Sequence, residues 1–331
     1  TFYYVVLVAL FAEICMIVID VSKRYLLVFD SVGNREGLIG GTGEGPGEFS
    51  SPRGMWVRGD TVAVSDGAGR FHLFRTTGEH LTTRAFRGVM DGPDVMVLGG
   101  IVATPHGWVT VASAFFRAGA DASLEPVSRN RLYRIDWRGE LEEVGFRLTH
   151  APVGRMVGVF FVRPPFATSP WFVLDGLGRV HLVSGPEYAI DVLHATGEPL
   201  YRVENEYPLD EITSRDLAEW RESRACAPGA SECDDARTEL ALRMEIPDFK
   251  PVVARIVGFA DGHIAVMRAD TDPDPDDRLS MGEYDLFAPD GAFLGRLPIG
   301  LSPRWFDGTT LVATTWDEFL VPSMVRYRVA R

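Results

Sequence analysis

The fold of this chain is indicated most clearly by the stretch Thr61-Val-Ala-Val-Ser-Asp66, which is followed by Arg70-Phe-His-Leu-Phe74 and a turn at Gly78. It holds two short segments of β-branched, aromatic and other apolar residues around a brief polar connection, which is the pattern of antiparallel strands. A further apolar segment, Gly54-Met-Trp-Val57, comes before them. With a short strand after Gly78 this makes a four-stranded unit, because glycine supplies the positive φ of tight hairpin turns.

The same unit recurs along the whole chain. Each copy has an apolar strand, a second alternating strand and a glycine-bearing turn. The paired strands of the six copies are 16–20 with 24–30, 61–66 with 70–74, 108–112 with 131–136, 179–183 with 188–193, 263–267 with 283–287, and 310–314 with 324–329. Four-stranded units repeated around an axis form a β-propeller. We therefore predict an all-β, six-bladed β-propeller of four-stranded antiparallel blades, with residues 1–331 as a single domain.

The N-terminal segment has two interpretations. The run 2–19 holds one charged residue, Glu13, so it fits a remnant of a signal sequence or membrane anchor. Its Val, Ile, Tyr and Phe content favours one or two buried strands. Residues 2–10 would then form either the outer strand that the sixth copy lacks or the innermost strand of the first blade. Because the chain starts at Thr1 rather than Met, we expect an upstream segment, and a membrane anchor there is one alternative.

The composition excludes one class of partner. The 331 residues include 46 acids and 33 bases, which gives a net charge of −13. A protein that binds a phosphate backbone needs a basic field, so we expect no nucleic acid partner. The 46% of hydrophobic residues is typical of a globular core, and 34 glycines with 21 prolines agree with many turns.

A loop before the second blade carries a family resemblance. The stretch Gly43-Glu-Gly-Pro-Gly-Glu-Phe49, then Ser51-Pro-Arg-Gly54, then Val64-Ser-Asp66 and Arg70, resembles NHL-type repeats. It is more closely similar to bacterial six-bladed β-propeller proteins that carry a G-x-G-P-G-E-F loop. The similarity is strongest over residues 16–90 and returns from residue 249 onward. The resemblance implies a propeller with NHL-like repeats and an extracytoplasmic location, in the periplasm or at the cell surface, often as a lipoprotein, although no lipobox is present here. The group is mostly uncharacterised, so the resemblance adds little on chemistry.

Long connections gather on one side of the predicted ring. In an up-and-down blade the first and third turns lie on one rim and the other connections lie on the opposite rim. The first set is short, whereas the second set includes long segments at 40–52, 114–130, 149–170, 204–252 and 270–280. Long loops on one side of a rigid scaffold are typical of a binding surface, and random drift of insertions is the alternative.

The longest connection, residues 204–252 between blades four and five, predicts a helical insertion. Thr213 suits the N-cap of a helix over 214–224, and a second helix is expected over 235–244. The pair forms a helical hairpin that either caps part of the ring mouth or only covers a blade edge.

Two cysteines fall between the predicted helices. Cys226 and Cys233 flank a short loop, and they either form a disulfide or remain free thiols. Cys15 lies in an apolar run and is expected in the core.

Local chemical signatures are weak. The loop 40–47 fits neither glycine-rich phosphate pattern, and Glu44 and Glu48 would repel a phosphate. The acidic run 270–277 has calcium-like spacing from Asp272, but lacks the required glycine, so calcium is a minor alternative and no cofactor is expected. His72 and His181 look equivalent within strands, where packing is the default. No histidine pair has a close metal-ligand spacing.

We therefore predict an exported, non-enzymatic binding module whose unknown protein or small-molecule ligand sits on the long-loop rim. A metal-assisted hydrolase or lyase, lactonase-like, with its site in the axial channel is the alternative. Asp66 and Arg70 are also explained by an ion pair within a blade, and Lys250 by an ordinary surface lysine. The candidate binding residues are Glu44, Glu48, Arg53, Asp66, Arg70 and Lys250.

Overall fold

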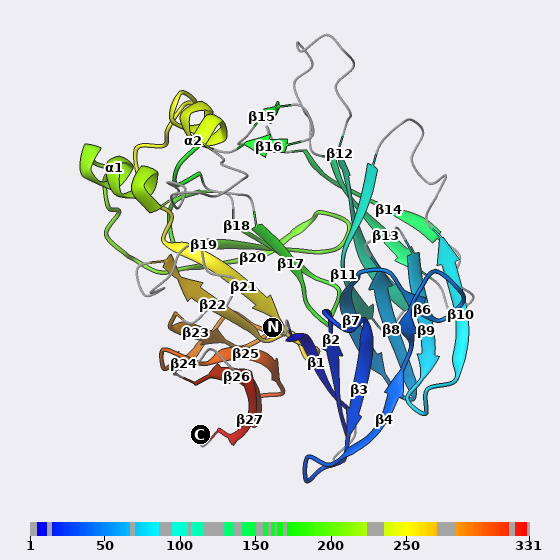
Figure 1. Cartoon of the computed structure of the whole chain (residues 1–331). Helices are drawn as coiled ribbons and strands as arrows, with labels where there is room; N and C mark the ends of the chain where they lie inside the picture. The colour runs from blue at the N-terminus through cyan, green and yellow to red at the C-terminus, as the bar shows by residue number, and fades with distance from the viewer. Residues whose placement is uncertain are drawn as a thin grey trace.

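Antiparallel sheets make up most of the computed structural model of this chain (Figure 1). The structure describes residues 5–11, 15–66, 70–85, 95–104, 107–115, 129–135, 141–149, 155–157, 160–162, 164–167, 171–183, 185–223, 235–269, 282–317 and 322–329. Five sheets have four strands each, and a sixth has three among these residues.

The strands of each sheet follow one another in the sequence. The first sheet consists of β1 (Val5–Phe11), β2 (Cys15–Asp20), β3 (Tyr25–Phe29) and β4 (Arg35–Ile39). The second consists of β7 (Pro52–Arg58), β8 (Thr61–Asp66), β9 (Arg70–Arg75) and β10 (His80–Ala85). The third consists of β11 (Val95–Thr104), β12 (Gly107–Phe115), β13 (Arg129–Ile135) and β14 (Leu141–Thr149). The others are β17 (Trp171–Leu174), β18 (Val180–Val183), β19 (Ala189–Leu193) and β20 (Pro199–Glu204); β21 (Val253–Gly258), β22 (Ile264–Arg268), β23 (Tyr284–Phe287) and β24 (Phe293–Leu297); β25 (Ser302–Phe306), β26 (Thr310–Trp316) and β27 (Pro322–Arg328). The predicted β-propeller with four-stranded antiparallel blades is confirmed.

The innermost strands form the ring. Strand β7 contacts β1 and β11, β17 contacts β11 and β21, and β1 contacts β25. The first and last sheets thus lie side by side, and buried Val18 of β2 packs against Val312 of β26. Figure 1 shows the blue first blade beside the red end of the chain.

The N-terminal run is a strand. Strand β1 pairs antiparallel with β2, and Leu10 lies opposite Met16. Of the two strand positions, the innermost strand of the first blade is therefore the one observed. The sixth sheet ends at β27 in the part of the chain that the structure describes.

The core lies between the sheets rather than within one layer. One cluster joins the first two blades and includes Ile17, Phe49 and Phe74. A second joins blades four and five through Tyr188 and Phe287, and further clusters continue the packing around the ring. Alternation along the strands turns side chains to the two neighbouring blades, which explains why most central strands are buried on both faces.

Two helices lie between β20 and β21. Helix α1 (Ser214–Ser223) and helix α2 (Asp235–Leu242) begin at the predicted residues. Thr213 caps α1: its backbone N–H and its hydroxyl both donate to Asp216 Oδ2, and its Oγ1 accepts from the Asp216 N–H. The intervening Cys226 and Cys233 lie outside the described residues.

Two small pairings were not expected from the sequence. Strands β5 (Gly41–Thr42) and β6 (Glu48–Phe49) pair in parallel inside the glycine-rich loop. Strands β15 (Arg155–Val157) and β16 (Phe160–Val162) form a hairpin within the connection between blades three and four. Both are too short for a periodic signal to reveal them.

Candidate functional site

The strand order defines two rims. Consecutive antiparallel strands place the β2–β3 type and β4–β7 type connections on one rim and the remaining turns on the other. We call the first the long-loop rim; it carries the segments 40–51 and 205–252. The opposite rim has tight turns such as Gly59-Asp60, where Gly59 has a φ of +56°.

The glycine-rich loop on the long-loop rim closes on itself. The Gly43 N–H donates to the Phe49 carbonyl, and the Gly45 N–H donates to the Glu48 carboxylate at 2.9 Å. Phe49 is fully buried and stacks edge-on against His72. Gly40 has a φ of +77°, and a Cβ there would lie 2.2 Å from the Phe49 ring. The residue pattern of this loop therefore serves its own compact fold.

Asp66 is buried and holds this loop in place. One oxygen, Oδ1, accepts from the Ser51 N–H at 2.7 Å, and the other, Oδ2, accepts from the Ser50 N–H at 3.0 Å. The Ser50 hydroxyl also reaches the carboxylate. The end of β8 is thereby fastened to the chain that enters β7.

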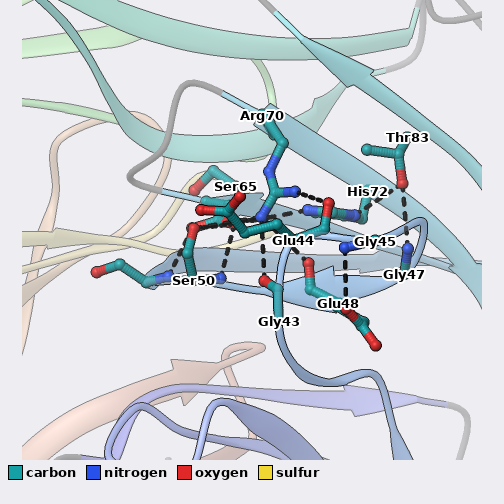
Figure 2. Close-up of polar contacts among 12 residues, drawn as sticks. Gly43, Glu44, Gly45, Gly47, Glu48, Ser50, Ser65, Arg70, His72 and Thr83 are labelled. Carbon is teal, nitrogen blue, oxygen red and sulfur yellow. Dashed lines mark hydrogen bonds and ion pairs between the residues drawn. The ribbon is translucent and has the colours of Figure 1, made fainter.

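Arg70, on β9, forms hydrogen bonds with the same loop. Its Nη2 lies 2.7 Å from Asp66 Oδ2, and its Nη1 donates to the Glu44 carbonyl at 2.6 Å. Longer contacts from Nη2 reach the carbonyls of Gly43 and Glu48. Figure 2 shows the Arg70 guanidinium beside Gly43, Glu44 and Ser50 of the loop. The sequence alternative of an ion pair within the blade describes this geometry.

The surroundings of Asp66 favour its charged form. Burial would raise the pKa of this carboxyl, but His72 and the hydrogen bonds from Ser50, Arg70 and Ser51 hold the pKa far below its usual range. The His72 Nε2 lies 3.8 Å from Asp66 Oδ2. Asp66 is therefore ionised throughout the physiological pH range.

A second polar chain extends from His72. Thr83 Oγ1 lies 2.9 Å from His72 Nδ1, 2.8 Å from His80 Nε2 and 3.3 Å from the Gly47 N–H, which donates to it. Burial and the nearby His72 lower the pKa of His80. Neither Thr83 nor His80 belongs to the predicted set, because nothing in their sequence context marks them.

The predicted binding residues fall into two places. Glu44, Glu48, Asp66 and Arg70 meet in the loop just described. Arg53 lies on β7, and its side chain lies outside the described residues. Lys250 lies elsewhere on the long-loop rim, where its Nζ contacts Asp216 Oδ1 of α1 at 2.6 Å and lies 5.9 Å from the centre of the Phe166 ring.

The sequence separation of Asp66 and Arg70 also occurs between Asp20 and Arg24. The Asp20–Arg24 spacing does not repeat the Asp66–Arg70 pair: Asp20 accepts from the Lys23 N–H and lies near Lys23 Nζ. Arg24 has a φ of +58°, and its backbone N–H bonds the Asp20 carbonyl, so the segment is a tight turn.

The two buried histidines are not equivalent. His72 lies on the third strand of its blade, whereas His181 lies on the second strand of blade four. His181 Nε2 is 2.8 Å from the buried Asp175, and Arg179 Nε binds the same carboxylate at 2.7 Å. This cluster lies on the opposite rim, and Arg179 also donates to the Gly262 carbonyl of blade five. It fastens neighbouring blades.

Sequence reasoning also missed a network between blades four and five. Tyr188 donates to the buried Asp285 at 2.9 Å, and Arg296 Nε binds the other carboxylate oxygen at 2.8 Å. Arg268 and Arg296 both donate to the Tyr207 hydroxyl. The partners are far apart in the sequence, so no local motif could show this arrangement.

Within the described ranges, no three His, Cys, Asp or Glu side chains gather in a group that could hold a metal ion. The acidic run 270–277 lies outside those ranges. Neither described helix combines the length and the apolar character needed to cross a membrane.

Known proteins share this architecture. A family model described as a 6-bladed beta-propeller matches residues 6–76. A protein from Bacteroides fragilis described as exported has a TM-score of 0.51 and 13% identity, covering 95% of this chain and 80% of that one. A streptogramin B lyase has a TM-score of 0.46 and 8% identity, with 99% and 83% covered. A catalytically inactive virginiamycin B lyase from Staphylococcus aureus with quinupristin has a TM-score of 0.45 and 10% identity, with 96% and 82% covered. At such identities the likeness shows the fold alone, and that fold is a β-propeller.

Proposed function

We propose that this chain is an exported binding module without a catalytic role, and that its ligand or protein partner sits on the long-loop rim beside the helices. The observation that carries the proposal is that the long connections between strands lie on one rim of the ring. The helices, the β15–β16 hairpin and the glycine-rich loop all belong to one rim, while the opposite rim has tight turns such as Gly59-Asp60 and Gly176-Leu177. Binding surfaces are commonly displayed on one side of a rigid scaffold.

Helix α1 adds a surface rather than a core, whereas Thr238 and Ala241 of α2 are buried. Helix α1 has no buried residue. Helix α2 packs against β16, which comes from the preceding connection of the same rim. Lys250 pins α1 through Asp216, and Arg221 of α1 forms an ion pair with Glu239 of α2. Neighbouring rim connections are thus joined into one raised structure over part of the ring.

Two observations support an exported location for this chain. The resemblance carried by residues 43–49 is to exported propellers, and a protein described as exported shares the fold. Nothing in the described residues favours the hydrolase or lyase alternative over binding, so we retain binding as the function.

The contacts between the two ends of the insert make it possible to test the proposal by deletion. Glu211 pairs with Phe249, and the Ile212 N–H donates to the Asp248 carbonyl, so the two ends of the insert lie side by side. Replacing residues 213–247 by a short Gly-Ser linker should leave the circular dichroism spectrum of the blades and cooperative unfolding intact. We expect the excised form to lose binding of a partner purified on the intact chain from the extracytoplasmic fraction.

A variant on the other rim provides the control. Val32 is 79% exposed in the β3–β4 turn, and Val32→Glu should bind as the intact chain does. Full binding by the excised form, or loss of binding in Val32→Glu, would contradict the proposal. A stoichiometric metal ion that survives dialysis would instead favour the metal-assisted alternative.

A further inference from the structure

The innermost strand of the sixth sheet carries an arginine with no carboxylate partner among the described residues. Arg304 lies on β25, and its Nε donates to Thr314 Oγ1 at 2.9 Å. Thr314 is neutral and buried on β26. The Arg304 side chain is half-buried, and a guanidinium that is partly removed from water without an acid has a desolvation cost that a bound anion would offset.

A second arginine, Arg255, lies on β21, the innermost strand of the preceding blade. Burial, and then the positive charge of Arg255 on β21, lower the pKa of Arg304 to about 10, while Tyr284 opposes this shift. Arg304 stays protonated at neutral pH, since even its lowered pKa lies well above that pH. Two positively charged side chains therefore lie on neighbouring inner strands of a chain whose net charge is −13.

The strand geometry is irregular at this point. On β25, Pro303 pairs with Ala313 and Trp305 pairs with Val312, so Arg304 is the extra residue of a β-bulge. Bulges bend a strand and redirect a side chain, and they are common beside functional sites. Arg304 therefore lies outside the regular pairing of β25 with β26, on the innermost strand of its blade.

The same placement occurs in the second blade. Ser51-Pro-Arg53 matches Ser302-Pro-Arg304 in sequence. On β7, Pro52 pairs with Asp66 and Gly54 with Ser65, so Arg53 is also the extra residue of a bulge. Both innermost strands start at the long-loop rim, because each follows a connection from the outer strand of the preceding blade.

We propose that the inner strands bind an oxyanion at their long-loop end, with Arg304 as its principal ligand and Arg255 adding positive charge. The guanidinium fork matches the two oxygens of a carboxylate or a phosphate group. This inference rests on the proposed function and deepens it, since it assigns an anionic group to the ligand of the same rim.

The test measures binding of inorganic phosphate and of succinate by titration calorimetry and by thermal unfolding, at constant ionic strength set with sodium chloride. We expect saturable binding of at least one of them and a matching rise in Tm. Arg304→Gln should weaken that binding about tenfold or more, since hydrogen bonds to charged groups are lost. Arg304→Lys, which keeps the charge but loses the fork, should fall between. The anion that binds identifies the source of the oxyanion as a phosphate or a carboxylate group.

Arg328→Gln is the matched control, because Arg328 is an exposed arginine on β27 of the same sheet. It should bind the anion as the unmodified chain does. Without added anion, Arg304→Gln should be at least as stable as the unmodified chain, because an enclosed charge is removed. Absence of any effect of both anions beyond that of chloride, or equal losses in Arg328→Gln and Arg304→Gln, would overturn the inference. The excised insert variant retains Arg304, so its anion binding is measured separately from partner binding.

Discussion

Asp66 and Arg70 face each other across the connection between β8 and β9, with Oδ2 and Nη2 2.7 Å apart. The pair does more than close a hairpin. Asp66 holds the backbone of Ser50 and Ser51, while Arg70 holds the Glu44 carbonyl, so one ion pair joins three segments. A buried pair of this kind specifies a loop conformation because each charge needs the other.

Removal of one partner should therefore be costly. Asp66→Asn keeps the shape of the side chain but leaves the Arg70 guanidinium without its counter-charge. We expect a loss of about 3 kcal/mol or more in the free energy of unfolding, measured by urea denaturation. Limited proteolysis should then cut within residues 43–49, where the intact chain resists.

An exposed ion pair of the same blade provides the comparison. Asp60 and Arg75 also form an ion pair, but their side chains are 59% and 44% exposed. Asp60→Asn should cost about 1 kcal/mol or less. Equal losses from the two substitutions would show that the Asp66–Arg70 pair has no special role in the loop.

Stability should fall in two steps as the pH is lowered. The pKa of His80 is lowered in the folded chain, so the unfolded chain binds its proton first, and stability should begin to fall below about pH 6.5. The pKa values of Asp66 and Asp175 are also lowered, so their contribution is complete above about pH 5 and is lost on further acidification. Urea midpoints measured from pH 8 to pH 3 give the profile.

Two variants separate the steps. His80→Gln should remove the decline near pH 6 and leave the acidic one, whereas Asp66→Asn should flatten the profile below pH 5. A profile of Asp66→Asn that runs parallel to that of the intact chain down to pH 3 would contradict the assignment.

The repeat predicts the blades because its signal is local. Alternation in 61–66 and 70–74 fixes two paired strands, and Gly78 marks their turn, so these elements follow from neighbouring residues. The Tyr188–Asp285 hydrogen bond joins residues that are far apart in the sequence, so it depends on how the chain returns in space. For the same reason the sequence finds Asp66 and Arg70 but not Thr83, which meets them only through His72.

Equivalent spacing proved a weak guide to equivalent contacts. Asp20 and Arg24 have the separation of Asp66 and Arg70, yet the Asp20 carboxylate accepts hydrogen bonds from Ser22 and Lys23 of its own turn. Side-chain roles in a repeat thus depend on the connection that each blade faces, and these connections are the variable part of the chain.

Close packing between blades four and five predicts an intolerant glycine. A Cβ on Gly176 would lie 1.9 Å from the Ala260 carbonyl oxygen, which is backbone and cannot move alone. Gly176→Ala should therefore push the two blades apart and cost about 1–3 kcal/mol of unfolding free energy in thermal or urea melts. Gly37→Ala on β4 is the control, because nothing lies within 4 Å of a Cβ there and the change should be near neutral. Similar melting temperatures for the two variants would refute the packing argument.

The cysteine pair of the insert remains a prediction, and it concerns a part of the chain next to described helices. Helices α1 and α2 are already joined by the ion pair of Arg221 and Glu239, and the two cysteines fall between these helices in the sequence. If Cys226 and Cys233 are bridged, reduction should speed proteolysis within 204–252 while blade unfolding stays unchanged, because α1 contributes no buried residue. Mass spectrometry after alkylation, with and without reductant, counts the free thiols. Identical cleavage of the reduced and oxidised chains in this region would show that no bridge constrains the helices.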